Sequence, residues 1–391
     1  MSSLYRDKNL QIVFGVTLMV VMGVSSIVPA LPSIMVALSI PPATIGLVIT
    51  AFTLPGVLIA PLTGILADRF GRKKVLIPAL VCFGVCGAGC ALTNDLWSLL
   101  LLRFGQGIGA GPLGVLYGTI IGDLYQGRQR TTAMGVNASV LSLGTALFPA
   151  LGGVLSLFGW RWPFLLSLTA LPVAWLCRTR LVIPEPKPTG SMGDYLKSAL
   201  RSMRSGPVLA LFACTLLGFC ILYGPLVTYL PVLLHQRFAA SPLVIGTVFG
   251  SASFLTALAA FGLGWLSAHI RKAVLLLAAA ASYFICVVLT PRMPGAWWTV
   301  APVLFFGLAQ GLCVPTTMTM LAGLAPEGQR AAYMAANGTL LRLAQTLAPM
   351  AMGLVYAASG LDMVFHVSAA LAVVMAVAVL AGLGLNFREA A

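Results

Sequence analysis

Long apolar runs separated by short polar intervals dominate this chain from one end to the other. A helix needs about 20 predominantly apolar residues to cross about 30 Å of hydrocarbon, and runs of that length recur along the whole sequence. The runs are continuous and do not alternate, which favours membrane-spanning helices over the strands of a barrel. We predict twelve spans, at residues 10–38, 43–66, 75–93, 96–121, 131–157, 163–179, 208–234, 243–268, 272–290, 295–323, 331–358 and 362–386.

Composition places these spans in a polytopic membrane protein surrounded by the lipid bilayer. Of the 391 residues, 59% are hydrophobic and only 8% are charged, and the mean hydropathy is +1.00. A soluble globule of this size cannot bury so much apolar surface. The predicted class is therefore an all-α, multi-pass protein of a bacterial-type cytoplasmic (inner) membrane.

Positive charge follows the topology of the spans. The formal net charge is +14, and eighteen of the 23 Lys and Arg residues fall in intervals on the same side as the N-terminus. Only Arg161, Arg237 and Arg292 fall on the opposite side. Because Lys and Arg are retained on the cytoplasmic side of membranes, we expect both termini in the cytoplasm. The charge does not indicate a nucleic-acid partner.

A polar interval divides the chain into two halves of six spans. We predict an N-terminal bundle at 1–179, a cytoplasmic linker at 180–207 and a C-terminal bundle at 208–391. Several residues of the first half recur 200 positions later in the second half. Several matches at one offset indicate that the two halves arose by duplication. A further match, Gln106-Gly107 with Gln310-Gly311, needs a slipped register. The matches at the common offset are Ile45-Gly46 with Ile245-Gly246, Gly64 with Gly264, Asn137 with Asn337, and Pro149 with Pro349.

The densest charge cluster lies between spans two and three, at residues 64–74, and reads GILADRFGRKK. Gly64 and Gly71 carry no side chain, so helices can approach closely there and the turn can adopt a positive φ. This stretch resembles the loop signature of the major facilitator superfamily. The resemblance implies twelve helices in two parallel six-helix repeats that rock around a site at mid-membrane.

Two more stretches resemble signatures of the same family. Residues 103–109 on span four fit the pattern R-x-x-Q-G-x-G, and span five carries the spaced glycines and proline of the family's antiporters. Phe148 departs from the second pattern, because glycine is usual there. The second resemblance implies export, as in the drug:proton antiporters. The helix-packing residues assigned from these signatures are Gly64, Gly71, Gly135, Gly144, Pro149, Gly152 and Gly153.

The resemblance also implies a charged conformational latch at the cytoplasmic face. Its members are Asp68, Arg69, Arg72 and Asp123, which would help to hold the outward-facing state. Protonation of either carboxylate would weaken such a latch, so proton coupling could act there. The alternative is a solvated surface salt bridge, worth less than about 1 kcal/mol.

Polar residues inside the spans are the candidates for the substrate cavity. All nine Asp and Glu residues fall in loops or at span ends, which disfavours a cationic substrate. Arg342 lies roughly 18 Å from the cytoplasmic end of its span, at 1.5 Å per residue, and a buried arginine without an acid invites an anion. The alternatives are that Arg342 is structural and that Arg103 snorkels to the outer interface. The full set is Arg103, Gln106, Asn137, Tyr223, Tyr229, Gln310, Asn337, Arg342 and Gln345.

Together these features predict a secondary active transporter that exports small amphipathic compounds by proton antiport. The proton would be the coupling ion, and no other cofactor, metal site or catalytic residue is expected, so the protein should not be an enzyme. We expect a monomer. One alternative is export or flipping of an anionic substrate, such as an organic anion, a siderophore or a lipid. The other is a membrane receptor that does not transport its ligand.

Overall fold

The computed structural model describes residues 7–183, 202–326 and 329–384. These residues form helices and contain no strand. By contact the chain divides into two compact units of helices. The predicted all-α membrane fold is confirmed.

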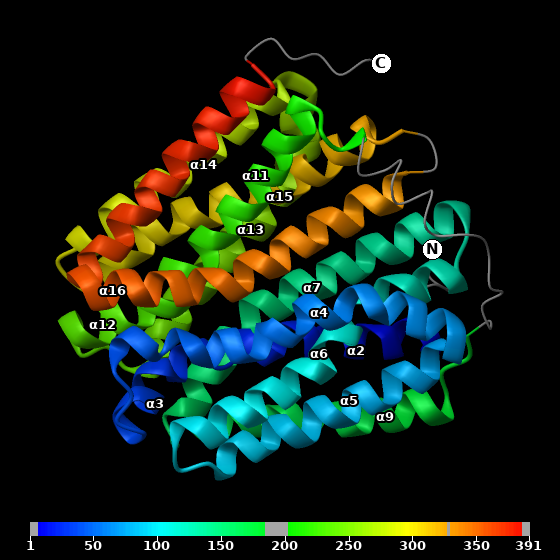
Figure 1. The fold of residues 1–391 in the computed structure, drawn as a ribbon, viewed down its shortest axis with the longest axis horizontal. Helices are drawn as coiled ribbons and strands as arrows, with labels where there is room; N and C mark the ends of the chain where they lie inside the picture. Colours follow the sequence, from blue (N-terminus) through cyan, green and yellow to red (C-terminus); the bar gives the residue numbers. More distant parts are fainter. Residues whose placement is uncertain (1–6, 184–201, 327–328, 385–391) are drawn as a thin grey trace. The chain divides into compact units, whose positions relative to one another are not determined.

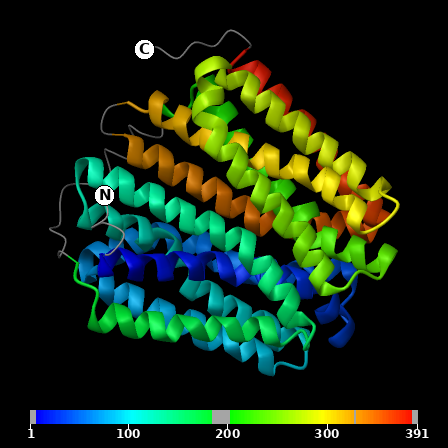
Figure 2. The ribbon, with the colours of Figure 1, turned by 180° about the vertical axis from the view of Figure 1, so that it is seen from behind.

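The first unit comprises Met1–Pro41, Leu47–Thr189 and Ser241–Thr247. Within it α5 packs against α6 and α9, and α2 packs against α6 and α7. Figure 1 shows α5 beside α9, and Figure 2 shows α7 beside α2. Its elements are α2 (Lys8–Ser25), η1 (Val28–Ala30), α3 (Leu31–Ala37), most of α4 (Gly46–Phe70), α5 (Arg72–Gly89), η3 (Cys90–Leu92), α6 (Leu96–Leu124), α7 (Gly127–Ser156), α8 (Trp162–Leu165), η4 (Leu166–Thr169) and α9 (Ala170–Thr179).

The second unit comprises Pro42–Gly46, Gly190–Ala240 and Val248–Ala391. Within it α11 packs against α15 and α16, and α14 packs against α15 and α16. Its elements are η2 (Pro42–Thr44), α11 (Gly206–Ile221), the π-helix η5 (Leu222–Tyr229), α12 (Leu230–Phe238), most of α13 (Pro242–His269), α14 (Lys272–Leu289), η6 (Thr290–Arg292), η7 (Trp297–Thr299), α15 (Val300–Leu324) and α16 (Arg330–Gly382).

Helix continuity differs from the predicted spans in several places. Ten described helices are long and apolar enough to cross a membrane, so the count of twelve is not reproduced element by element. Prolines divide span 10–38 into α2, η1 and α3, because proline lacks the N–H that continues a helix. Span 163–179 is divided among α8, η4 and α9. The last two spans lie in α16, whose 53 residues are interrupted by Gly360 at φ 79° and ψ −176°.

Glycine contacts repeat between the units at the predicted offset of 200. In the first unit, a Cβ added to Gly246 would lie 2.4 Å from the carbonyl oxygen of Pro149. In the second unit, a Cβ added to Gly46 would lie 2.7 Å from the carbonyl oxygen of Pro349. The short segments that carry these glycines, Pro42–Gly46 and Ser241–Thr247, therefore group with the half opposite to their place in the sequence.

Helices α6 and α15 also follow this offset. A Cβ added to Gly107 would lie 2.1 Å from the carbonyl oxygen of Phe52, and one added to Gly307 would lie 2.3 Å from that of Ala252. The two glycines are 200 residues apart in the sequence, and so are Phe52 and Ala252, which supply the carbonyl oxygens. The slipped register expected for the two glutamines of these helices is therefore wrong.

Candidate functional site

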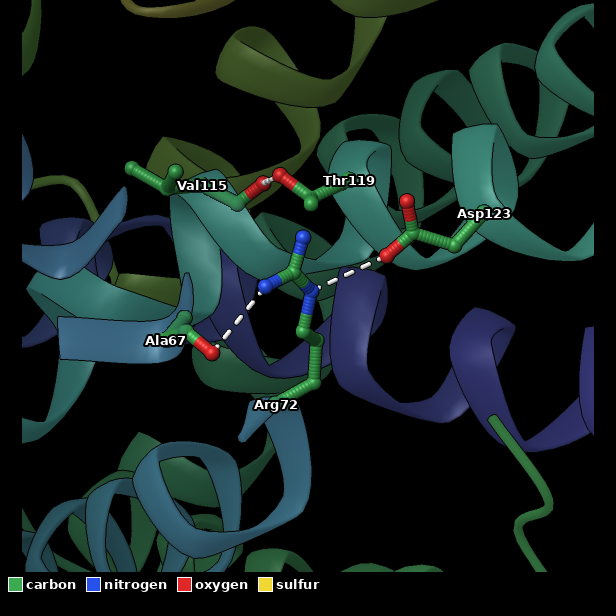
Figure 3. A network of polar contacts seen from close by, with 5 residues as sticks. All are labelled: Ala67, Arg72, Val115, Thr119 and Asp123. Carbon is green, nitrogen blue, oxygen red and sulfur yellow. Dashed lines mark hydrogen bonds and ion pairs between the residues drawn. The ribbon is translucent and has the colours of Figure 1, made fainter. Parts of the chain in front are cut away.

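Arg72 connects the beginning of α5 with the last turn of α6. Gly71 precedes it with φ 96°, a conformation that favours glycine, and Arg72 is the first residue of α5. Its Nε donates to Oδ2 of Asp123 at 2.9 Å, and its Nη1 donates to the carbonyl oxygen of Ala67 at 3.0 Å (Figure 3). The side chain of Arg72 is 8% exposed and that of Asp123 is 30% exposed. Because the pair is partly buried, dissolved salt weakens its attraction less than it would weaken the solvated surface salt bridge considered as the alternative.

The other two predicted latch residues are not seen in this pair. The side chain of Asp68 lies outside the part of the chain that the structure describes. Arg69 is exposed, and its guanidinium carbon lies 5.7 Å from the ring centre of Phe70. The roles of Asp68 and Arg69 in the latch therefore stay predictions.

A second polar contact joins the residue after α6 to the beginning of α2. The hydroxyl of Tyr125 donates to Oδ2 of Asp7 at 2.6 Å. The other oxygen of Asp7 accepts from the backbone N–H of Asn9 at 2.8 Å, which caps α2. Sequence reasoning missed this contact, because only the cap is visible in the local sequence and Tyr125 is 118 residues away.

The Tyr125 contact should give stability a specific dependence on pH. Burial, and then the bond to the Asp7 carboxylate, raise the pKa of the Tyr125 hydroxyl above its ordinary value. A raised pKa stabilises the fold fully below the unfolded value of about 10 and loses that contribution as pH rises through the folded value. We expect the melting temperature to fall more steeply above about pH 10 in the wild type than in Tyr125→Phe. Parallel profiles across that range would contradict the expectation.

Arg103 lies entirely inside the first unit and is 0% exposed. Its Nη1 donates to the carbonyl oxygen of Gly23 on α2 at 2.9 Å, and its Nε donates to that of Val48 on α4 at 3.2 Å. Nη1 also donates to Oε1 of Gln106 at 2.7 Å, and the guanidinium lies 4.4 Å from the ring centre of Phe52. Arg103 thus links three helices and does not snorkel to an interface. Among the described residues its Nη2 has no hydrogen-bond partner.

Gln106 and the two repeated asparagines also make contacts between helices. Nε2 of Gln106 donates to the hydroxyl of Ser167 at 2.9 Å. Oδ1 of Asn137 accepts from Thr17 at 2.8 Å, and Oδ1 of Asn337 accepts from Thr215 at 2.6 Å. The side chains of both asparagines and of their two threonine partners are buried. In each unit the repeated asparagine therefore accepts from a buried threonine of another helix, and a role of either asparagine toward substrate stays a prediction.

Tyr223, Arg342 and Gln345 come together in the second unit. Tyr223 lies on the π-helix η5, a kind of helix that is frequent at functional sites. Its hydroxyl accepts from Nε2 of Gln345 at 2.9 Å. Arg342, on the same helix as Gln345, lies within electrostatic range of that hydroxyl and is half-buried. This cluster combines a cation, an amide and a phenol.

Tyr229 and Gln310 make other contacts in the second unit. The ring of Tyr229 stacks on Tyr356 at 5.4 Å between centres, and its hydroxyl donates to the carbonyl oxygen of Pro42 at 3.4 Å. Tyr229 is 0% exposed. Gln310 lines a small cavity in the second unit together with Tyr283, which sequence reasoning did not select. No local signal marks Tyr283, since a tyrosine in an apolar span usually packs in the core.

The predicted packing residues divide into tight and open positions. A Cβ added to Gly152 would lie 1.9 Å from the carbonyl oxygen of Ser26, and one added to Gly153 would lie 2.7 Å from that of Pro242. Gly144 is also tight, at 3.0 Å from the side chain of Leu18. The open positions are Gly64, Gly71 and Gly135, where no atom of the described residues comes within 4 Å. Pro149 lies within α7, between the tight glycines.

Comparisons with known proteins agree with this architecture. The structure superposes on a bacterial homologue of the human lysosomal transporter Spinster with a TM-score of 0.79, at 17% identity and 96% coverage of each chain. It superposes on the D-xylose–proton symporter with the same score and identity, at 98% coverage of each chain. At such identity these likenesses show the fold alone.

Sequence relatives include two proteins named as exporters and one named as a multidrug transporter. The chain is 32% identical over 164 residues to the bacillibactin exporter of Bacillus subtilis, covering 40% of this chain and 41% of the relative. It is 34% identical over 120 residues to the multidrug transporter protein MdtP of the same organism, covering 30% and 22%. It is 31% identical over 252 residues to the cephamycin export protein CmcT of Amycolatopsis lactamdurans, covering 59% and 50%. The matches thus span half or less of these relatives.

A sequence model of a whole family covers far more of the chain than any of these relatives. That model, described as Major Facilitator Superfamily, matches residues 13–304 and 234–389. The two matched stretches take in both units of helices. The chain therefore belongs to the Major Facilitator Superfamily.

Proposed function

We propose that this protein is a secondary active transporter that exports small amphipathic compounds by proton antiport. The observation that carries the proposal is that two relatives are named as exporters, of bacillibactin and of cephamycin, and a third is named as a multidrug transporter. Alternating access would rock one helical bundle against the other around a site at mid-membrane. The protein would act as a monomer in a bacterial-type inner membrane, with both termini in the cytoplasm and no enzymatic activity.

The pair of Arg72 and Asp123 supports proton coupling in this proposal. Asp123 lies in the last turn of α6, remains partly accessible, and binds a nearly buried cation at 2.9 Å. Protonation of its carboxylate removes one charge of the pair and weakens the link between α5 and α6. A proton taken up at Asp123 would in this way favour one conformational state over the other.

Transport in proteoliposomes tests the proposal. Vesicles with an acidic lumen would be given ethidium, a neutral dye or fluorescein, and we expect at least one compound to accumulate until nigericin collapses the pH gradient. Asp123→Asn should reduce this accumulation about tenfold or more, because the residue no longer gains or loses a proton. Asp95→Asn is the matched control, since Asp95 caps the other end of α6 and is exposed.

Two outcomes of this assay would count against the proposal. If every compound equilibrates without regard to the pH gradient, proton antiport is rejected. If Asp123→Asn and Asp95→Asn transport equally well with the same pH dependence, Asp123 is not the coupling residue.

The Tyr223 cluster favours a second candidate, export of an anionic substrate. Arg342 is half-buried on α16, and Gln345 adds an amide that is held by Tyr223. An arginine offers several donors in a planar arrangement that suits carboxylate and phosphate groups. The sequence places all nine carboxylates in predicted loops or at the ends of predicted spans. In this candidate function Arg342 would bind the charged group of an organic anion, a siderophore or a lipid.

A further inference from the structure

A small cavity lies inside the second unit, among α11, α14, α15 and α16. Its lining includes Thr215 and Phe219 from α11, Tyr283 from α14, Gln310 from α15 and Asn337 from α16. The space open to the centre of a water molecule is about 10 Å³, which is close to what one water needs. No charged residue is among the residues that line it.

Two polar atoms of this lining lack a partner. Within the described part of the chain, the hydroxyl of Tyr283 and Oε1 of Gln310 have no hydrogen-bond partner. Tyr283 is 0% exposed and Gln310 is 7% exposed, so bulk water does not satisfy them. A buried polar group without a partner costs about 1–3 kcal/mol, and native proteins rarely leave two in one place.

The other repeat shows that packing does not require these polar atoms. At the offset of 200, Tyr283 corresponds to Phe83 and Gln310 corresponds to Ala110. Phe83 fills its position with 0% exposure and without a hydroxyl group. Both polar groups are therefore present in one repeat only, and both line the same cavity. Such a coincidence is typical of a place where another molecule supplies the missing partner.

The chemistry of the lining selects a neutral group that both donates and accepts. Gln310 offers an acceptor, and the Tyr283 hydroxyl can donate. The nearby Asn337 oxygen is already bonded to Thr215 at 2.6 Å. A cation would find no carboxylate here and an anion would find no arginine or lysine. A hydroxyl group fits both the two partners and the size of the cavity.

The cavity also adjoins the candidate cluster of the second unit. Phe219 lines the cavity, and its ring stacks on that of Tyr223 with centres 6.5 Å apart. On α16, Leu341 lines the cavity and is the neighbour of Arg342. A substrate held by Arg342 and Tyr223 could therefore extend a small group past Phe219.

We propose that this cavity is a binding site for one hydroxyl group, which donates to Gln310 and accepts from Tyr283. The hydroxyl comes from a water molecule in the ligand-free protein or from the end of a substrate. The second source rests on the proposed transport function, whereas the first does not.

Two measurements on the full chain test the site. The first is a structure of the ligand-free protein at a resolution that shows water, in which we expect one water within hydrogen-bonding distance of Tyr283 and Gln310. The second compares the binding of radiolabelled 4-octylphenol with that of its methyl ether, which lacks the donor. We expect the phenol to bind about threefold to tenfold more tightly, as one neutral hydrogen bond predicts.

Substitutions assign these results to the cavity. Tyr283→Phe reproduces the residue of the other repeat, and Gln310→Leu keeps the size of the side chain. Each should abolish the preference for the phenol and remove the bound water. Tyr333→Phe is the matched control, because Tyr333 is 1% exposed in the same unit but its hydroxyl bonds to Ser202 at 3.1 Å.

The outcomes distinguish water from a substrate as the source of the hydroxyl group. They also distinguish a failure of this site from a failure of the proposed transport function. Water density alone supports the site with water as its occupant, and a preference for the phenol alone supports a substrate hydroxyl. The proposal is overturned if the cavity is empty and the phenol and its ether bind equally, or if Tyr333→Phe has the same effects as Tyr283→Phe. Neither measurement depends on transport, so the site can stand even if gradient-driven export fails.

Discussion

Gly152→Ala is expected to destabilise the protein by about 3 kcal/mol or more, whereas Gly135→Ala should be neutral or slightly stabilising. The added methyl group at position 152 would lie 1.9 Å from the carbonyl oxygen of Ser26. That oxygen belongs to the backbone, so relief requires α7 to move away from the end of α2. At position 135 no atom of the described residues lies within 4 Å, and alanine favours a helix over glycine by up to about 1 kcal/mol.

The comparison uses one substitution on one helix. Both variants are purified in a mild detergent, and their melting temperatures and denaturant midpoints are compared with those of the wild type. Gly153→Ala provides an intermediate case, with its methyl group 2.7 Å from the carbonyl oxygen of Pro242. Equal stability of Gly152→Ala and Gly135→Ala would show that α7 does not pack against α2 as described.

The sequence predicts small residues on α7 but not which of them are in contact. Gly135 and Gly152 belong to the same signature, and the facing group at Gly152 is a carbonyl oxygen of Ser26, more than a hundred residues earlier. A glycine pattern names no partner on another helix. The spans themselves were predictable, because hydropathy is a property of each segment alone.

Breaks within helices and the partners of buried polar groups were less predictable. Gly360 interrupts α16 at φ 79°, and a single glycine in an apolar run gives no reason to expect this. Asn137 was assigned to the cavity because it is polar within a span, yet its oxygen bonds to Thr17, 120 residues away. The contact between Arg72 and Asp123 joins two members of the latch that the resemblance to the family implied, whereas the local sequence of either residue names no partner.

Arg103→Ala is expected to destabilise the protein by about 3 kcal/mol or more, and Arg342→Ala by less than about 1 kcal/mol. Arg103 is 0% exposed and bonds to carbonyl oxygens of two neighbouring helices. Its truncation leaves a cavity, removes a contact with the face of Phe52 and leaves Oε1 of Gln106 without its donor. Arg342 is half-buried, so water can fill the space that its truncation opens.

For ligand binding we expect the opposite order, with substitution of Arg342 having a larger effect than substitution of Arg103. A ligand that binds only the folded protein stabilises it by about 2.7 kcal/mol at a hundredfold excess over Kd. If the second candidate function holds, anionic amphiphiles will raise the melting temperature of the wild type and of Arg103→Met, which restores most of the volume without the charge. The same anions should have no effect on Arg342→Ala, because the group that binds their charge is gone.

A panel of cationic, neutral and anionic amphiphiles decides between the two candidate functions. If anions alone stabilise the wild type and Arg342→Ala loses that effect, the anionic substrate is favoured and Arg103 is left with a structural role. If cations and neutral compounds stabilise the wild type and Arg342→Ala equally, Arg342 is structural and the broader amphipathic range is favoured. The stability difference between the two alanine variants stands in either case, because it follows from the complete burial of Arg103 and the half-burial of Arg342.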